Sequence, residues 1–264
     1  MLVVKERLHF VLVHGFGGGG WVFYKIRPLL EKLGHKVSCP DLKSAGIDST
    51  DPKTIQTFQQ YDQPLFDLLS TLPNNDKVIL VGHSSGGVSL THAIHNFPHK
   101  IHVAVFVAAT MLQNGFSTQQ DFADGIPNLF LEENGSEGNA KTDPTCTDQK
   151  QLLNDPELGM HLCPPEDIAL FSMLQKEGPY QVIRDANFKE DRGADVVPRV
   201  YIKSMHDRVV IPKQQESMLK RWPPSQVYSV ESDHYPFVSK PLDVFGILIK
   251  IAANVPCKSG TWPV

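Results

Sequence analysis

Lys77-Val-Ile-Leu-Val-Gly-His-Ser-Ser-Gly-Gly-Val88 is the stretch that decides the fold. An apolar, β-rich run at 78–81 meets Gly82-His83-Ser84-Ser85-Gly86, and a helix-like segment follows. This is the Gly-x-Ser-x-Gly pattern of a nucleophile elbow, in the strand–turn–helix context that the motif requires. The turn is expected to hold Ser84 in a strained backbone conformation, and the flanking glycines relieve the crowding that a Cβ would cause there. The stretch therefore predicts a nucleophilic serine above the edge of a sheet.

A Gly/Ser strand-to-helix turn without chemistry is the alternative interpretation of this stretch, because short patterns of this kind also occur by chance. The apolar strand before the turn and the helix after it favour the elbow. An elbow also places Ser84 near a helix N-terminus, where free N–H groups stabilise an oxyanion.

Length and composition set broad limits on fold and partners. A chain of 264 residues suits one α/β domain with an inserted subdomain. A net charge of −4 gives no reason to expect nucleic acid or an anionic membrane as a partner. Residues 1–7 lack the apolar run of a signal peptide, and the four cysteines lack CxxC spacing, which favours free thiols. These features predict a cytoplasmic enzyme or binding protein without a membrane partner.

Apolar runs alternate with amphipathic segments through the first part of the chain. Strands are expected at 8–13, 37–39, 78–81, 101–108, 196–203 and 227–230, and helices at 22–33, 55–72, 87–97, 213–221 and 242–253. This order predicts an α/β fold with a mostly parallel sheet and helices on both faces. The 55–72 helix is expected to kink or break at Pro64.

The alternation stops between the fourth and fifth expected strands. Residues 1–110 and 190–264 are predicted to form the core, and 111–189 to form an inserted, mainly helical cap. Aromatic side chains are scattered through this insert at irregular spacing. Most are expected to form the small core of the cap, and we predict that Phe122 and Phe130 line a substrate pocket.

A serine hydroxyl needs a base to take its proton at neutral pH. In this architecture the acid and the base follow the serine in the order Ser, Asp or Glu, His. Asp207 follows the strand at 196–203, and His234 follows the strand at 227–230. Both loops leave the carboxyl ends of parallel strands, as the elbow does. Asp207 as a helix cap and His234 as an ordinary loop histidine are the alternatives; their joint placement predicts the triad Ser84, Asp207 and His234.

The glycine-rich stretch after the first strand predicts the other half of the site. His14-Gly15-Phe16-Gly17 lets the backbone approach a ligand closely, and the Phe16 and Ser85 N–H groups are predicted to form the oxyanion hole. Gly15, Phe16, Gly17 and Tyr235 are predicted to contact the substrate.

The same stretch also matches a dinucleotide fingerprint. Gly15-x-Gly17-x-x-Gly20 follows a strand, and Asp41 stands at the end of the second strand. The bulky Trp21 after the third glycine and His14 at the strand end argue against a nicotinamide enzyme. That interpretation would also leave the elbow unexplained, so no cofactor is predicted.

Four other histidines have plain structural interpretations. His92, His95 and His99 lie near one another on the helix after the elbow but lack carboxylate or cysteine support, which predicts a solvated helix face and no metal site. His83 lies inside the elbow and is expected to point away from the nucleophile.

Many short motifs in matching order make the chain similar to the plant methylesterase and hydroxynitrile lyase family of α/β-hydrolases. The likeness covers most of residues 8–251 and is carried by His14-Gly15 through Gly20-Trp21, Tyr24-Lys25, Pro28-Leu-Leu30, Gly34-His-Lys-Val37, Asp41-Leu42, Lys77 through Ser84, Pro164 to Leu170, Pro198-Arg-Val-Tyr-Ile202 and Asp233-His234. The resemblance implies an α/β-hydrolase fold, a helical cap, the same triad and an enzyme without a cofactor. It also implies small ester substrates, commonly methyl esters of hormone-like or specialised-metabolite acids.

Two positions separate the branches of this family. Hydroxynitrile lyases that this chain resembles carry Thr in place of Gly15 and Lys in place of Tyr235, and that lysine supplies positive charge for the departing cyanide. Gly15 and Tyr235 therefore favour the methylesterase branch. Phe16, Gly17, Gly18 and Ser85 depart from the residues usual in the family. These positions border the acyl pocket, so the substrate does not follow from the resemblance.

We therefore expect a serine carboxylesterase that hydrolyses a small ester through an acyl-enzyme; a β-keto acid product would then lose CO₂ without further help. A small-ligand binding or receptor-like protein with vestigial hydrolysis is the first alternative, and a hydroxynitrile lyase is the second. The expected partner is a small-molecule ester, with a homodimer left open.

Overall fold

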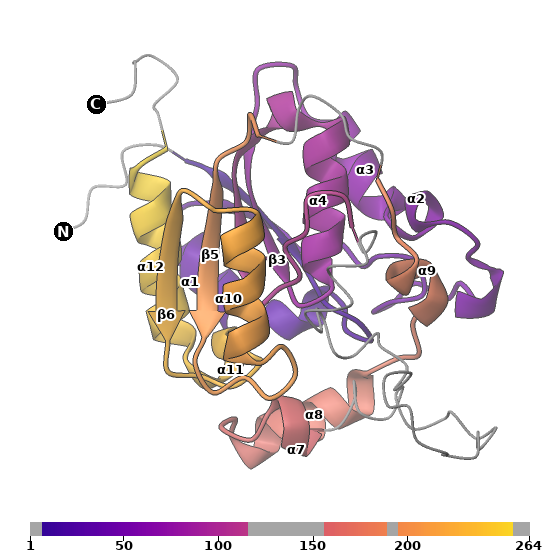
Figure 1. The fold of residues 1–264 in the computed structure, drawn as a ribbon, viewed down its shortest axis with the longest axis vertical. Coiled ribbons are helices and arrows are strands. Elements are labelled where there is room, and N and C mark those ends of the chain that lie inside the picture. The colour runs from indigo at the N-terminus through magenta and orange to yellow at the C-terminus, as the bar shows by residue number, and fades with distance from the viewer. Residues whose placement is uncertain (1–6, 116–155, 189–194, 256–264) are drawn as a thin grey trace.

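A six-stranded parallel sheet forms the centre of the molecule. The structure, a computed structural model, describes residues 7–115, 156–188 and 195–255 (Figure 1). The strand order is β2-β1-β3-β4-β5-β6, and all neighbouring strands pair in parallel. The strands are β1 (His9–Val13), β2 (Lys36–Ser38), β3 (Val78–His83), β4 (Ile101–Val107), β5 (Arg199–Ser204) and β6 (Gln226–Val230). The predicted α/β architecture with a mostly parallel sheet is confirmed.

The apolar runs become strands because both faces of the sheet are covered. Successive side chains of a strand point to opposite faces. Phe10 and Leu12 of β1 accordingly pack in one core, and Val11 and Val13 pack in the other. A strand buried on both faces reads as a continuous apolar run.

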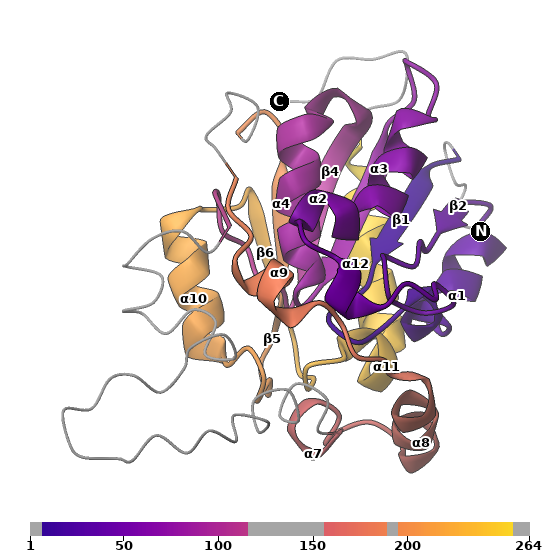
Figure 2. The ribbon, with the colours of Figure 1, turned by 90° about the vertical axis from the view of Figure 1, so that its right-hand side faces the viewer.

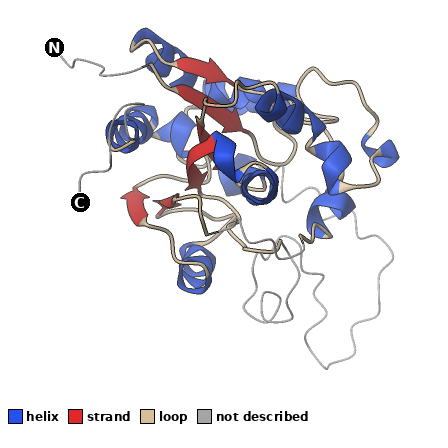
Figure 3. Cartoon of the chain, turned by 90° about the horizontal axis from the view of Figure 1, so that it is seen from above, coloured by secondary structure: helices blue, strands red, loops and turns tan. Residues whose placement is uncertain are grey.

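Helices cover the two faces of the sheet in separate layers. One layer contains α2 (Phe58–Tyr61), α3 (Gln63–Ser70), α4 (Gly86–Asn96) and α10 (Pro212–Arg221), and the other contains α1 (Ile26–Lys32), α11 (Pro236–Ser239) and α12 (Pro241–Ala253). Figure 2 shows α3 and α4 in front of the strands and α12 behind them. Figure 3 shows the same layers from above.

Two expected helices are interrupted in the structure. The segment at 22–33 divides into the 3₁₀ helix η1 (Gly20–Phe23) and α1, and the segment at 55–72 divides into α2 and α3. The second break falls at Asp62, because Pro64 lies within the first turn of α3, where a missing N–H is tolerated. The described residues also contain the 3₁₀ helices η2 (Pro52–Thr54) and η3 (Pro98–Lys100).

Three short helices lie outside the two layers: two lie near the carboxyl ends of the strands, and the third lies beside α2. They are α7 (Pro156–Gly159), α8 (Pro165–Leu174) and α9 (Tyr180–Arg184) (Figure 1). They belong to the predicted cap, whose limits at 111 and 189 stay a prediction. Phe122 and Phe130 lie outside the described residues. Across the three described ranges, the helices are too short or too polar to cross a membrane.

Close backbone packing at the elbow gives a test of the fold. A Cβ on Gly86 would lie 2.5 Å from the His14 carbonyl oxygen, whereas a Cβ on Gly246, in α12, would meet nothing within 4 Å. We predict that Gly86→Ala lowers the free energy of unfolding by about 1–3 kcal/mol, because backbone has to shift. Gly246→Ala, the matched control, should raise it by about 0.5–1 kcal/mol, because alanine favours helix. Urea unfolding measures both; equal effects would contradict the packing described here.

Candidate active site

Ser84 occupies the sharp turn between β3 and α4. Its backbone has φ 53°, in the left-handed region that non-glycine residues rarely adopt. The Ser84 N–H donates to the Val107 carbonyl (3.3 Å), and the Ser84 carbonyl accepts the Thr110 N–H (3.0 Å). A Cβ on Gly82 would lie 2.5 Å from Leu90 Cδ1. The strained conformation and the crowding predicted from the Gly-x-Ser-x-Gly pattern are therefore both present.

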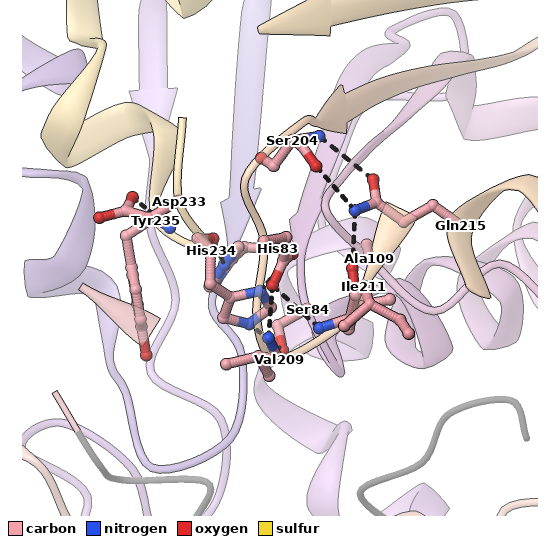
Figure 4. Close-up of polar contacts among 12 residues, drawn as sticks. His83, Ser84, Ala109, Ser204, Val209, Ile211, Gln215, Asp233, His234 and Tyr235 are labelled. Atoms are coloured by element: carbon pink, nitrogen blue, oxygen red, sulfur yellow. Dashed lines mark hydrogen bonds and ion pairs between the residues drawn. The ribbon is translucent and has the colours of Figure 1, made fainter. Parts of the chain in front are cut away.

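Three side chains that are far apart in the sequence form a continuous hydrogen-bonded line at this turn. His234 Nε2 lies 2.9 Å from Ser84 Oγ, and His234 Nδ1 lies 2.8 Å from Asp207 Oδ2 (Figure 4). An ionised carboxylate only accepts hydrogen bonds, so Nδ1 carries the proton and Nε2 accepts from the serine hydroxyl. The side chains of His234 and Asp207 are 4% and 0% exposed. The residues predicted as a triad are thus brought into proton-transfer distance.

The loop that carries Asp207 is held by its own hydrogen bonds. Asp207 Oδ1 accepts the N–H groups of Val209 (2.7 Å) and Val210 (2.9 Å), which leaves Oδ2 for the imidazole. The fully buried Gln215 of α10 donates to the carbonyls of Ser204 (3.0 Å) and Val210 (2.7 Å) and accepts the Ser204 N–H (3.1 Å) (Figure 4). Gln215 therefore fixes both ends of the Asp207 loop, a role that sequence reasoning missed because a lone glutamine on a helix carries no pattern.

The predicted oxyanion donors flank Ser84 on two different loops. Ser85 is the N-cap residue of α4, and the first N–H groups of a helix have no partner within the helix. A Cβ on Gly15 would lie 2.8 Å from Ser84 Cβ, so the Gly15–Phe16 backbone passes beside Ser84. This placement is compatible with the predicted donor role of the Phe16 and Ser85 N–H groups, which stays a prediction.

A cavity with mainly aromatic walls borders the elbow. The larger side chains around it are Phe16, Trp21, His83, Phe171, Gln175 and Tyr235. Of the residues predicted to contact substrate, Gly15, Phe16 and Tyr235 line this cavity. Gly17 does not; its carbonyl accepts the Lys176 N–H (2.9 Å).

The apparent dinucleotide fingerprint has a local structural explanation. Asp41 Oδ1 accepts the Gly20 N–H (2.6 Å), and Asp41 Oδ2 accepts the Ile47 N–H (3.0 Å). The acidic residue therefore holds the glycine-rich loop itself. The third glycine, Gly20, begins the four-residue 3₁₀ helix η1, which is too short to supply the phosphate-binding helix N-terminus of a dinucleotide fold.

His83 supports the histidine loop, a contact that the sequence did not reveal. Its Nε2 lies 2.7 Å from the His234 carbonyl oxygen, to which it donates, and the two ring centroids are 4.7 Å apart. Burial, and then the neighbouring His234, hold the pKa of His83 well below its usual value. His83 is therefore a neutral donor that fixes the His234 backbone.

The prediction of a solvated face for the α4 histidines is wrong for two of them. His92 is buried: its Nδ1 lies 2.9 Å from Asp62 Oδ2, and its ring stacks on Phe188 at 4.7 Å. His95 donates from Nε2 to the Gln113 carbonyl (2.8 Å). Other segments pack over the outer face of α4, so polar residues on that face are buried; His99, beyond the helix, is exposed.

Comparison with known proteins identifies the family. Residues 10–246 match the model described as "Alpha/beta hydrolase family". The chain is 46% identical over 255 residues to Methylesterase 17 of Arabidopsis thaliana, covering 94% of this chain and 92% of that protein. It belongs to the plant methylesterase family of α/β-hydrolases.

Two further comparisons agree with this assignment. The methylesterase-type hydrolase is 38% identical to Pheophorbidase of Raphanus sativus, with 92% and 93% of the two chains covered. It is similar to the crystal structure of the methylesterase protein MES16 from Arabidopsis, with a TM-score of 0.77, 35% identity, and 93% and 99% of the chains covered. The predicted family, fold and class, a carboxylic ester hydrolase, are confirmed.

The buried neutral His83 gives a pH-dependent prediction. Below about pH 6.5 the unfolded chain protonates this histidine and the folded protein does not, so stability falls as the pH falls. We predict that the unfolding free energy of His83→Gln falls less steeply between pH 6 and pH 5 than that of the wild type. The difference between the two slopes should be at most about 1.4 kcal/mol per pH unit, the contribution of one proton. Urea unfolding at several pH values measures both slopes. Equal slopes for the variant and the wild type would show that His83 is not held neutral.

Proposed function

We propose that this methylesterase-type hydrolase cleaves a small methyl ester through an acyl-enzyme on Ser84. The observation that carries the proposal is the line from Ser84 Oγ to His234 Nε2 and from His234 Nδ1 to Asp207, at 2.9 and 2.8 Å. A base in direct contact with the hydroxyl, itself oriented by a buried carboxylate, is what a serine nucleophile requires.

Acylation uses each part of this arrangement once. Ser84 Oγ attacks the ester carbonyl carbon while His234 Nε2 takes the hydroxyl proton. The tetrahedral oxyanion receives hydrogen bonds from the N–H groups of Phe16 and Ser85, and each such donor stabilises the transition state by about 3 kcal/mol. The imidazolium, stabilised by Asp207, gives its proton to the departing methoxide, which leaves as methanol.

Deacylation repeats the chemistry with water. His234 takes a proton from the water that attacks the acyl-enzyme carbonyl, and then returns it to Ser84 Oγ as the acid is released. If the released acid is a β-keto acid, it loses CO₂ in a later step that needs no further protein group.

The expected substrate is an ester of a small acid, of the hormone-like or specialised-metabolite kind that the family resemblance implies. Aromatic walls from Phe16, Trp21 and Phe171 suit apolar or aromatic carbon. The two relatives differ in name, a methylesterase and a pheophorbidase, so the acid is left to experiment.

Hydrolysis is favoured over the alternatives by the residues beside the triad. Gly15 has no side chain next to Ser84, which leaves room for an acyl group, and Tyr235 brings no positive charge for a departing cyanide. No described contact favours a receptor-like role over turnover. A cytoplasmic location and a homodimer stay predictions.

Replacing the nucleophile tests the proposal. Ser84→Ala should abolish turnover across a panel of methyl esters and leave the unfolding free energy close to that of the wild type, because only the attacking oxygen is lost. Liquid chromatography with mass detection follows each acid and its decarboxylated product.

A buried serine on α4, the helix that follows Ser84, provides the control. Ser89 Oγ donates to Asp62 Oδ1 (2.6 Å) and makes no hydrogen bond to the triad. Ser89→Ala should lower stability by about 1–3 kcal/mol, because a buried carboxylate loses a donor, and leave turnover per folded molecule near the wild-type value. Retained ester hydrolysis by Ser84→Ala would refute the assignment.

A further inference from the structure

A second carboxylate stands next to the triad histidine without touching its ring. Asp233 immediately precedes His234, and its side chain is completely buried. Oδ1 accepts the Tyr235 N–H (3.1 Å) and the Ser239 hydroxyl (2.8 Å). Both donors belong to the chain just beyond His234, so this oxygen closes the histidine loop on itself.

The other oxygen of Asp233 reaches across to the segment between α7 and α8. Oδ2 accepts the Leu162 N–H (2.9 Å) and the Cys163 thiol (3.3 Å). A third bond joins the same two segments, from the His234 N–H to the Gly159 carbonyl (3.1 Å). The 159–163 segment and the histidine loop are therefore linked by three hydrogen bonds, two of which end on one carboxylate.

Packing leaves little freedom at this junction. A Cβ on Gly159 would lie 3.1 Å from Cε2 of the Tyr235 ring, so the 159–163 segment runs in contact with the residue after His234. The Tyr235 ring also lies edge-on to Phe171 of α8 at 5.0 Å. A shift of the 159–163 segment would move the His234 backbone with it.

We infer that Asp233 is a positioning residue, which sets the His234 imidazole by fastening the histidine loop to the 159–163 segment. This rests on the proposed role of His234 as the base. The two carboxylates then have different roles. Asp207 orients the ring of His234 through Nδ1, and Asp233 fixes the backbone that carries the ring. Misplacing a catalytic group by about 1 Å can lower a rate about 100-fold.

The chemistry of the four donors explains why a carboxylate stands here. Two backbone N–H groups, one hydroxyl and one thiol all donate, so the site needs an acceptor with two oxygens and no proton of its own. Burial and the nearby carboxylate of Asp233 raise the pKa of the Cys163 thiol, which keeps its proton available. An amide in place of the carboxylate would turn one acceptor into a donor facing two other donors.

Asp233→Asn, Cys163→Ala and Cys163→Ser test the inference on 4-nitrophenyl acetate. Active sites are titrated with a phosphonate ester, so that each kcat refers to folded, reactive molecules. We expect Asp233→Asn to lower kcat about 10- to 100-fold with a much smaller change in KM. Cys163→Ala should lower kcat relative to Cys163→Ser, which keeps a hydrogen-bond donor. The double variant Asp233→Asn/Cys163→Ala should lose no more than Asp233→Asn alone, because the thiol then has no carboxylate to bind.

A second readout does not depend on turnover. NMR would follow the proton on His234 Nδ1, which faces Asp207 Oδ2 and is expected to give a low-field resonance. It should weaken or move in Asp233→Asn and Cys163→Ala and stay in place in Cys163→Ser. If the wild type hydrolyses no ester, the proposed function fails while this resonance still decides the inference.

The opposite results would overturn the positioning role. They are a kcat per titrated site within about twofold of the wild type for Asp233→Asn, or losses that multiply in the double variant. If Asp233→Asn does not fold, the Cys163 pair decides: equal kcat values and equal Nδ1 resonances for alanine and serine would show that Asp233 only stabilises the fold.

Discussion

The left-handed backbone at Ser84 is the constraint on which the rest of the structure depends. A non-glycine residue in this conformation costs about 1–3 kcal/mol, so the surroundings have to enforce it. They do so through the Val107 carbonyl and the Thr110 N–H, which hold the Ser84 backbone on both sides. Gly82 and Gly86 have no side chain, and the positions that a Cβ would take are occupied by Leu90 and by the His14 carbonyl.

The parallel sheet brings the loops that carry Asp207 and His234 to the turn at Ser84. Because β3, β5 and β6 run in the same direction, the loops after them end at one edge, although Ser84, Asp207 and His234 are up to 150 positions apart in the chain. Each loop then has its own support. Gln215 holds the Asp207 loop, and His83 and Asp233 hold the His234 loop. Burial of these three side chains keeps water from competing for their hydrogen bonds.

The sequence was sufficient for the sheet and the sharp turn at Ser84, and it singled out the three side chains that the structure brings together, whose catalytic roles stay a proposal. Apolar runs of strand length, the Gly-x-Ser-x-Gly turn and the chain order Ser, Asp, His are local or ordered signals, and each has a direct physical reading. The position of the break in the 55–72 helix was harder to predict from the sequence. Pro64 can interrupt a helix or stand in the first turn of a new one, and here it does the latter, so the break falls at Asp62.

The supporting contacts had no such signal. Gln215, His83 and Asp233 act through partners that lie distant in sequence. His83 and Asp233 stand inside recognisable motifs, but those motifs do not reveal these contacts. The burial of His92 depends on packing over α4 by Phe66 and Phe188, which no periodicity of the helix itself reveals. Pairing between distant segments decides these positions, and a single sequence does not show pairing.

Covalent labelling tests most directly whether the elbow presents Ser84, and not its neighbour, to the imidazole. The enzyme is treated with an organophosphorus ester at neutral pH, and the peptide that spans 77–88 is sequenced by tandem mass spectrometry. The account predicts one phosphoryl group per molecule, on Ser84, and no labelling when His234 is replaced by alanine. Label on Ser85, or unchanged labelling without the His234 imidazole, would contradict it.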